Sequence, residues 1–415
     1  YGKRRVGKTT LIQKALKSSS YRTVYFECLK GTMQDNISGF VQELIRAKIL
    51  PVPLNFATLQ DVFVYLNALP EKIIVVIDEY PYLKAMNDSA TVDSIFQNII
   101  DNRLVNIGLI LSGSHIGMMK DTLQEKNALY GRFAVTIKLN ELNYLEAAKF
   151  YPDKTPYDKA AHYAVFGGSP FVNQVLNPTA TIRENIISTI LNPMSAVYLY
   201  ASQLLLSDYS VKINAERIFS VIGNGKKRYT EIEDKLDVKK TGNLSKQMKS
   251  LIDLEIIARN SPINKIGDNK KSTFEINDNL LRFYFTFIYK NTSALQVLGA
   301  EAFYDEYIAP TLTDFISRRF EGICRDYFSL QVRSGKMKGV RNIGSYYYDD
   351  PIHRKNGEFD VALEFADGYE IYEAKYYAQP MTLDEIHREV QQVEAIKELK
   401  VKQIGFIAIN GFAER

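Results

Sequence analysis

The sequence predicts a multidomain α/β protein whose first domain is a doubly wound parallel sheet, and three observations support this class. The segment Gly2–Thr9, G-K-R-R-V-G-K-T, is glycine-containing and leads directly into a helical pattern. The segment Lys72–Glu79, K-I-I-V-V-I-D-E, is an apolar run that ends in two carboxylates. Up to about Leu139, strand-like and helix-like stretches alternate, which is typical of βαβ units and a parallel sheet.

The first segment has the composition of a complete phosphate-binding loop, or Walker A motif. In such a loop the backbone N–H groups reach phosphate oxygens without obstruction by a Cβ atom. Lys8 supplies a charge for the β- and γ-phosphates, and Thr9 offers a hydroxyl to Mg²⁺. The helix expected at Leu11–Leu16 adds its N-terminal dipole. The residues expected to hold the nucleotide are Gly2, Lys3, Arg4, Arg5, Val6, Gly7, Lys8, Thr9 and Thr10.

A chance glycine turn is the alternative interpretation of this loop. A strand ordinarily precedes a phosphate-binding loop, whereas only Tyr1 precedes Gly2 in this sequence. We therefore expect the natural chain to begin earlier, and its abrupt end at Arg415 also suggests a missing C-terminal piece.

The apolar run before Asp78 predicts a strand that is buried on both faces. Asp78 at its carboxyl end is expected to hold Mg²⁺ together with Thr9. Glu79 follows and is the candidate for orienting or deprotonating an attacking water. The alternative is a buried strand that ends in a solvated acidic turn.

A further strand, Asn106–Ser112, ends in polar residues that suit a sensor of the γ-phosphate, with Ser112 and Ser114 as candidates. For Ser114 the alternative is a helix cap. Arg132 follows and is a candidate arginine finger, or else a surface cation.

Composition excludes several other classes of protein. No apolar run approaches the ~20 residues that span a bilayer, so we expect no membrane partner. Cys28 and Cys324 are too few and too far apart for a disulfide framework or a zinc site, which favours the cytoplasm. A net charge of +4 is too small to indicate nucleic acid without local clustering.

We expect four domains, in line with roughly 100–200 residues for each domain. They are a nucleotide-binding core (1–139), a helical lid packed on it (140–207), a winged helix-turn-helix (208–290) and, after a tether at Asn291–Ala294, an α/β restriction-endonuclease-like domain (298–415). The core is expected to contain further strands at Arg22–Glu27 and Phe133–Leu139 and helices at Asn36–Lys48, Leu59–Leu69 and Val92–Asn102.

The third domain shows helical patterns at Ala215–Ile222, Glu231–Leu236 and Gly242–Leu254, followed by two strands that frame a polar turn. Helix and turn concentrate cations that would suit a duplex backbone: Lys226, Lys227, Arg228, Lys239, Lys240, Lys246, Lys249, Lys265, Lys270 and Lys271. A winged helix used as a protein spacer is the alternative.

The last domain carries a second set of chemical groups. Glu373 and Lys375 are two apart on one expected strand, so they share a face. If the strand that carries Asp360 pairs with it, two carboxylates and a lysine surround one Mg²⁺ or Mn²⁺. Glu321, on a preceding helix, is a further candidate ligand. Such a group suits phosphodiester hydrolysis, and a salt-bridged sheet face is the alternative.

With these residues in view, the chain resembles the archaeal-type P-loop ATPases of the AAA+/STAND neighbourhood, which occur in prokaryotes. The motifs that carry the resemblance are Y-G-K-R-R-V-G-K-T-T-L, I-D-E-Y-P-Y-L, L-S-G-S-H-I, L-Y-G-R, F-G-G-S-P, I-N-D-N-L-L-R-F-Y-F and G-E-F-D…Y-E-A-K. The resemblance implies ATP binding and hydrolysis, followed by a winged helix and a domain similar to PD-(D/E)XK nucleases.

Two functions from different classes follow from this. In the first, the protein is an ATP-driven machine that acts on DNA, with Asp360, Glu373 and Lys375 as a nuclease site. In the second, it is a nucleotide-dependent switch whose C-terminal half binds a protein partner or a second copy of the chain.

Overall fold

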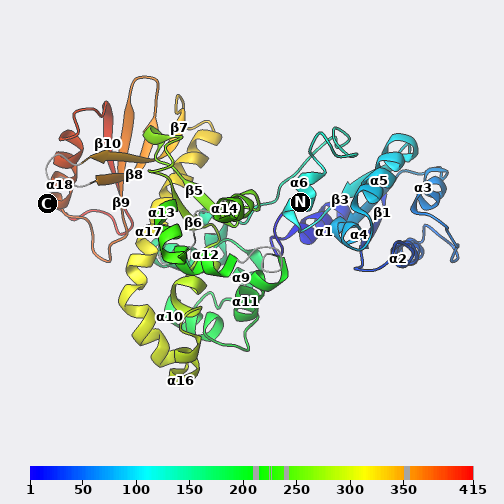
Figure 1. The fold of residues 1–415 in the computed structure, drawn as a ribbon, viewed down its shortest axis with the longest axis horizontal. Coiled ribbons are helices and arrows are strands. Elements are labelled where there is room, and N and C mark those ends of the chain that lie inside the picture. The colour runs from blue at the N-terminus through cyan, green and yellow to red at the C-terminus, as the bar shows by residue number, and fades with distance from the viewer. Residues whose placement is uncertain (209–214, 224, 226, 238–242, 350–355, 415) are drawn as a thin grey trace. The chain divides into compact units, whose positions relative to one another are not determined.

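The computed structural model describes residues 1–208, 215–223, 225, 227–237, 243–349 and 356–414. The chain divides into two compact units, Tyr1–Glu141 and Leu142–Arg415 (Figure 1). Among the described residues, no helix is both long and apolar enough to cross a membrane.

The first unit is built on a parallel sheet in the order β1-β2-β3. Its strands are β1 (Arg22–Glu27), β2 (Ile73–Asp78) and β3 (Ile107–Leu111), which confirms three of the predicted strands. Thr32 and Thr58 begin two of the flanking helices with capping boxes, in which Thr and Asp side chains satisfy the free helical N–H groups. The helices are α1 (Lys8–Lys17), α2 (Met33–Arg46), α3 (Leu59–Asn67), α4 (Tyr80–Met86), α5 (Ser89–Arg103) and α6 (Ile116–Asp121).

The predicted strand at Phe133–Leu139 is wrong. The segment forms backbone hydrogen bonds of the kind found between strands only with Tyr1. The Tyr1 ammonium donates to the Ile137 carbonyl at 2.7 Å, and Leu139 N–H donates to the Tyr1 carbonyl at 2.7 Å. A strand needs a neighbour along its length, and the apolar side chains of Val135 and Ile137 are instead 73% and 62% exposed.

The second unit begins with the helices that we expected to form a lid on the nucleotide-binding core. Helix α8 (Pro156–Phe166) packs against α15 (Asn279–Phe283) and α17 (Ala309–Arg333), and its apolar residues belong to the core of the second unit. The apolar face of α8 is thus matched by helices that follow it in the chain, and the lid on the nucleotide-binding core stays a prediction. The other helices here are α7 (Tyr144–Ala147), α9 (Pro170–Val175), α10 (Ile182–Asn185) and α11 (Ala196–Asp208).

In the segment 215–276, the described residues form three α-helices and a small antiparallel sheet in the order β4-β6-β5. The three predicted helices and two predicted strands are present, and β4 is an addition. The elements are α12 (Ala215–Ile222), β4 (Lys227–Arg228), α13 (Tyr229–Leu236), α14 (Asn243–Asp253), β5 (Ile257–Asn260) and β6 (Thr273–Ile276). The predicted cations Lys226, Lys239 and Lys240 lie outside the described residues.

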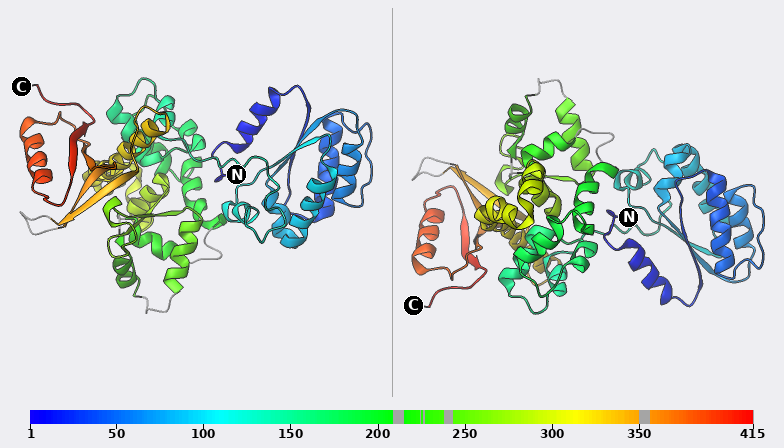
Figure 2. Two further views of the ribbon diagram at one scale, coloured as in Figure 1. Left: turned by 90° about the horizontal axis from the view of Figure 1, so that it is seen from above. Right: turned by 90° about the horizontal axis from the view of Figure 1, so that it is seen from below.

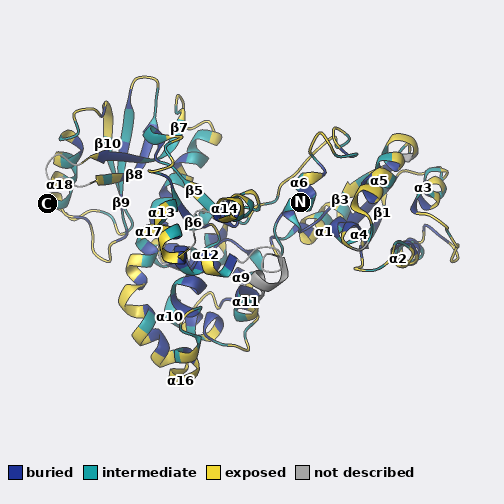
Figure 3. Cartoon of the chain, in the orientation of Figure 1, coloured by how far each residue is buried: buried dark blue, intermediate teal, exposed yellow. Residues whose placement is uncertain are grey.

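The chain ends in a four-stranded sheet in the order β10-β9-β8-β7. Figure 2 shows this sheet in orange and red from two further directions, and Figure 3 shows its buried residues in dark blue. Its elements are β7 (Asn342–Asp349), β8 (Asn356–Glu364), β9 (Tyr369–Lys375), α18 (Leu383–Glu394) and β10 (Val401–Ala408). Sequence analysis missed β7, and the expected tether at Asn291–Ala294 runs into helix α16 (Thr292–Phe303).

Two apolar layers bury the faces of this sheet. Val361 and Leu363 belong to the same core cluster as residues of α17, whereas Phe359 and Ile371 cluster with Val393 of α18. The sheet is therefore sandwiched between helices, and β9 ends at Lys375, one of the polar residues that the sequence singles out.

Candidate nucleotide site and C-terminal carboxylate group

The phosphate loop wraps around the ammonium group of Lys8. Lys8 Nζ donates to the carbonyl oxygens of Gly2 at 3.0 Å and Lys3 at 2.8 Å. Gly7 adopts φ 93°, a left-handed conformation that favours glycine, immediately before α1 begins at Lys8. The first turn of α1 contains no acidic residue, so its N-terminal dipole faces the loop without a compensating charge.

Asp78, at the end of β2, accepts hydrogen bonds on both carboxylate oxygens. Thr9 Oγ1 donates to Oδ2 at 3.1 Å, the Tyr25 hydroxyl donates to the same oxygen, and Glu79 N–H donates to Oδ1 at 2.9 Å. Burial raises the pKa of Asp78, but the hydrogen bonds outweigh it and hold that pKa below its usual range. Asp78 is therefore an ionised carboxylate next to the Thr9 hydroxyl.

Ser112 supplies an independent sign that a ligand fits here. Its hydroxyl is buried and meets no hydrogen-bond partner among the described residues, although it lies near enough to Asp78 to help lower the pKa of that carboxyl. Buried polar groups ordinarily have partners. The loop, the Thr9 hydroxyl, the Asp78 carboxylate and the buried Ser112 hydroxyl beside it thus form a set of groups that fits a nucleotide with Mg²⁺.

Glu79 is held in a strained backbone conformation and is bonded to Ser114, which follows β3. Its φ is 49° and ψ 41°, and its Oε2 accepts hydrogen bonds from Ser114 N–H at 3.1 Å and Ser114 Oγ at 2.8 Å. Strained backbone of this kind clusters at functional sites. The alternative role of Ser114 as a helix cap is wrong, since His115 caps α6 through its Nδ1 atom.

Arg132 is paired on the surface of the first unit. Its guanidinium donates two hydrogen bonds to Asp101, both at 2.9 Å. Arg132, Lys8 and Ser112 nevertheless line one cavity of about 550 Å³. A role as arginine finger therefore stays a prediction, and it requires the Asp101 pair to open.

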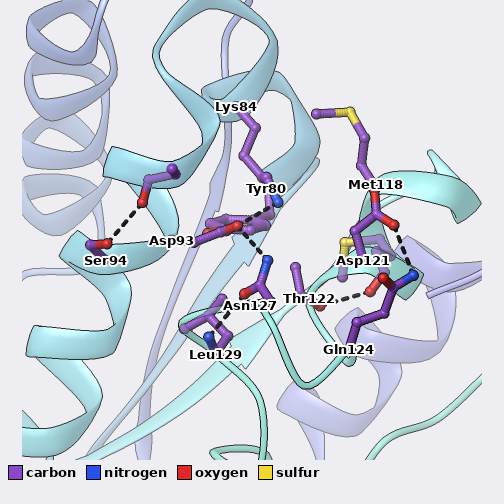
Figure 4. Close-up of polar contacts among 12 residues, drawn as sticks. Tyr80, Lys84, Asp93, Ser94, Met118, Asp121, Thr122, Gln124, Asn127 and Leu129 are labelled. Carbon is purple, nitrogen blue, oxygen red and sulfur yellow. Dashed lines mark hydrogen bonds and ion pairs between the residues drawn. The ribbon is translucent and has the colours of Figure 1, made fainter.

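A buried ion pair fixes the helix that follows Glu79, as Figure 4 shows. The Asp93 carboxylate accepts hydrogen bonds from the Tyr80 hydroxyl at 2.6 Å, Lys84 Nζ at 2.8 Å and Asn127 Nδ2 at 2.8 Å. The side chains of Lys84 and Asp93 are only 3% and 4% exposed. The group joins α4, α5 and the loop after α6, and sequence analysis missed it.

Replacing Asp93 by Asn should destabilise the first unit, because it leaves the Lys84 charge buried and unpaired. Breaking one partner of a buried pair typically costs about 3–5 kcal/mol. Calorimetry should show a lower melting temperature for the unfolding transition of the first unit. That transition is recognised because ATP binding raises its melting temperature. Asp101→Asn, which breaks an exposed pair on the same helix, should leave the melting temperature close to that of the wild type, because exposed pairs contribute little to stability. Equal shifts for the two variants would contradict the prediction.

The C-terminal residues Asp360, Glu373 and Lys375 lie together, and their strands β8 and β9 pair as antiparallel neighbours. Asp360 Oδ2 accepts a hydrogen bond from Ala374 N–H at 3.1 Å, and Lys375 Nζ lies 2.8 Å from Glu373 Oε1. Burial, with the nearby charges of Glu373 and Glu321, raises the pKa of Asp360 to about 8. Burial is likewise the main reason that the pKa of Glu373 is raised.

This group differs from the expected metal site in two respects. Among the described residues, no three His, Cys, Asp or Glu side chains are placed to hold one metal ion, so Glu321 does not complete a triad. Glu321 forms an ion pair with Arg325 at 3.9 Å instead. Glu389 of α18, which sequence analysis missed, lies 3.0 Å from Lys375 Nζ, so the lysine bridges two carboxylates.

The polar turn between β5 and β6 packs on strand β7. Asn264 donates to the Tyr347 carbonyl at 2.7 Å and accepts from Tyr347 N–H at 3.0 Å. Lys271 Nζ donates to the Tyr347 hydroxyl at 2.5 Å and lies 3.8 Å from the centroid of its ring. Lys271 therefore contacts Tyr347 of β7, and a role of Lys271 in binding DNA stays a prediction.

Comparison with known proteins finds an ATPase family over the stretch that includes the first unit. Residues 1–172 match a family described as an ATPase domain predominantly from Archaea, and residues 284–391 match one described as archaeal and bacterial proteins of unknown function. An uncharacterized protein of Methanocaldococcus jannaschii is 29% identical over 333 residues, 79% of this chain and 71% of the relative.

Among solved structures, the Walker-type ATPase of Pyrococcus abyssi is similar at a TM-score of 0.52 and 20% identity, covering 68% of this chain and 89% of that one. This likeness concerns the fold alone. The chain therefore contains an archaeal-type P-loop ATPase domain, followed by a C-terminal segment from a family of unknown function.

Proposed function

We propose that the protein hydrolyses ATP at the site formed by Gly2–Thr10, Asp78 and Glu79, and that its second unit acts on DNA. Lys8 is held by loop carbonyls and is placed to exchange them for β- and γ-phosphate oxygens. The Thr9 hydroxyl and Asp78 would hold Mg²⁺, which when bound neutralises phosphate charge. Glu79, once released from Ser114, accepts the proton of the attacking water.

The observation that carries the DNA-directed part is the group of Asp360, Glu373 and Lys375 at the end of β9. Two partly buried carboxylates beside a lysine are suited to hold a divalent cation and to stabilise charge on a phosphodiester. We further propose that residues 215–276 are a winged helix. Lys246 and Lys249 are exposed on α14, whereas the turn between β5 and β6 is packed on β7. We therefore propose that α14 is the element that contacts the duplex backbone.

Plasmid nicking tests the nuclease assignment. The purified protein should nick supercoiled plasmid in Mn²⁺, and Glu373→Ala should lose this activity because one of the two carboxylates is removed. Glu370→Gln is the matched control: it lies on the same strand, three residues away and hence on the opposite face, and should nick normally. Nicking that persists in Glu373→Ala would contradict the assignment.

A second candidate function, a nucleotide-dependent switch that binds a protein partner, is favoured by two observations. Lys375 is already neutralised by Glu373 and Glu389, and the turn between β5 and β6 is used as an internal contact. ATP hydrolysis without nicking, and without DNA binding at low salt, would select this function.

A further inference from the structure

Tyr25 is a neighbour of the nucleotide site that no sequence motif includes. It lies on β1, the strand beside β2, and is half-buried. Its hydroxyl donates to Oδ2 of Asp78, the oxygen that also accepts from Thr9. A tyrosine on the adjacent strand thus contacts the carboxylate that is expected to hold the metal ion.

The orientation of Asp78 follows from a count of its acceptor positions. An ionised carboxylate has about four lone-pair sites. Tyr25 and Thr9 occupy the two on Oδ2, and Glu79 N–H occupies one on Oδ1. Ser112 lies close to Asp78 but makes no hydrogen bond of normal geometry, so one position on Oδ1 is left for a stronger partner. Because the Thr9 proton is directed at Asp78, the lone pairs of the Thr9 oxygen are also left for a cation.

We propose that Tyr25 is a positioning residue that fixes the Asp78 carboxylate so that one oxygen is presented to the hydration shell of nucleotide-bound Mg²⁺. This inference rests on the proposed ATP site and adds a residue that sets its metal affinity. Without the phenol hydroxyl, Asp78 rotates more freely and must be ordered when the metal binds.

Tyr25→Phe tests the proposal because it removes the hydroxyl and keeps the ring. Electron paramagnetic resonance of Mn²⁺ reports metal binding to the protein with ADP, independently of hydrolysis. The half-saturating Mn²⁺ concentration should rise about tenfold, as expected for loss of one hydrogen bond to a charged group. ADP affinity in EDTA should stay within about twofold, since hydrogen bonding to Asp78 does not contribute to phosphate binding by the loop.

Tyr21→Phe is the matched control, because Tyr21 directly precedes β1 and its side chain is 51% exposed. It should bind Mn²⁺ as the wild type does. Equal Mn²⁺ affinity of Tyr25→Phe and wild type would overturn the inference and leave the ATP site intact. Loss of ADP binding by Tyr25→Phe in EDTA would also overturn it, in favour of a purely structural role. Failure of the wild type to bind ADP would instead refute the proposed ATP site.

Discussion

Replacing Lys8 by Ala should abolish measurable binding of Mg·ATP. The ammonium group of Lys8 is enclosed by the loop and bonded to two of its carbonyl oxygens, so it is preorganised at the position of the phosphates. Charge-assisted hydrogen bonds to phosphate are each worth about 1.5–3 kcal/mol, so loss of those to the β- and γ-phosphates should lower the affinity by at least about 100-fold, which leaves no measurable heat of binding. Isothermal titration calorimetry measures this loss directly.

Lys14→Ala is the control for Lys8, because Lys14 lies on the same helix, is exposed and carries the same charge. Its affinity for Mg·ATP should match that of the wild type. If Lys8→Ala retained an affinity within a few-fold of the wild type, the loop would not be the phosphate-binding site.

Glu79→Gln should bind ATP and hydrolyse it about 100-fold more slowly, or slower still. The amide keeps the shape of the side chain and the contact with Ser114, but it cannot accept the proton of the attacking water. Steady-state phosphate release, measured beside the calorimetric affinity, separates turnover from binding.

Glu71→Gln, at an exposed ion pair of the same unit, should leave turnover unchanged. Unchanged turnover in Glu79→Gln would mean that another carboxylate is the catalytic base. Glu27 would then be the first candidate, because burial and the charges of Asp78 and Glu79 raise its pKa and mark it as a neighbour of the site.

The elements that could be predicted from sequence are those with local signals. Strand β2 is a continuous apolar run that a parallel sheet buries on both faces, and α14 has its apolar residues at helical spacing. The segment Phe133–Leu139 has the same local appearance as a strand, but strand formation depends on a neighbour, which is not a local property. The packing of α8 also depends on helices more than 100 residues later.

In the candidate site, too, some residues have a local sequence signal and others are defined only by contacts with distant parts of the chain. Lys8, Thr9 and Asp78 belong to motifs with fixed spacing and could be named from sequence. Tyr25 could not, because it reaches Asp78 across 53 residues and belongs to an ordinary apolar strand. The bond between Ser114 and Glu79 spans 35 residues, and the Asp93 group joins three separate elements.

The central claim is that this chain hydrolyses ATP at the site formed by the loop and the end of β2. The most direct test is release of inorganic phosphate from ATP by the purified protein in Mg²⁺, with Lys8→Ala prepared in parallel. We predict release that requires Mg²⁺, is proportional to the amount of protein and is absent in Lys8→Ala. Equal release by Lys8→Ala, or none by a wild-type protein that is folded, would contradict the claim.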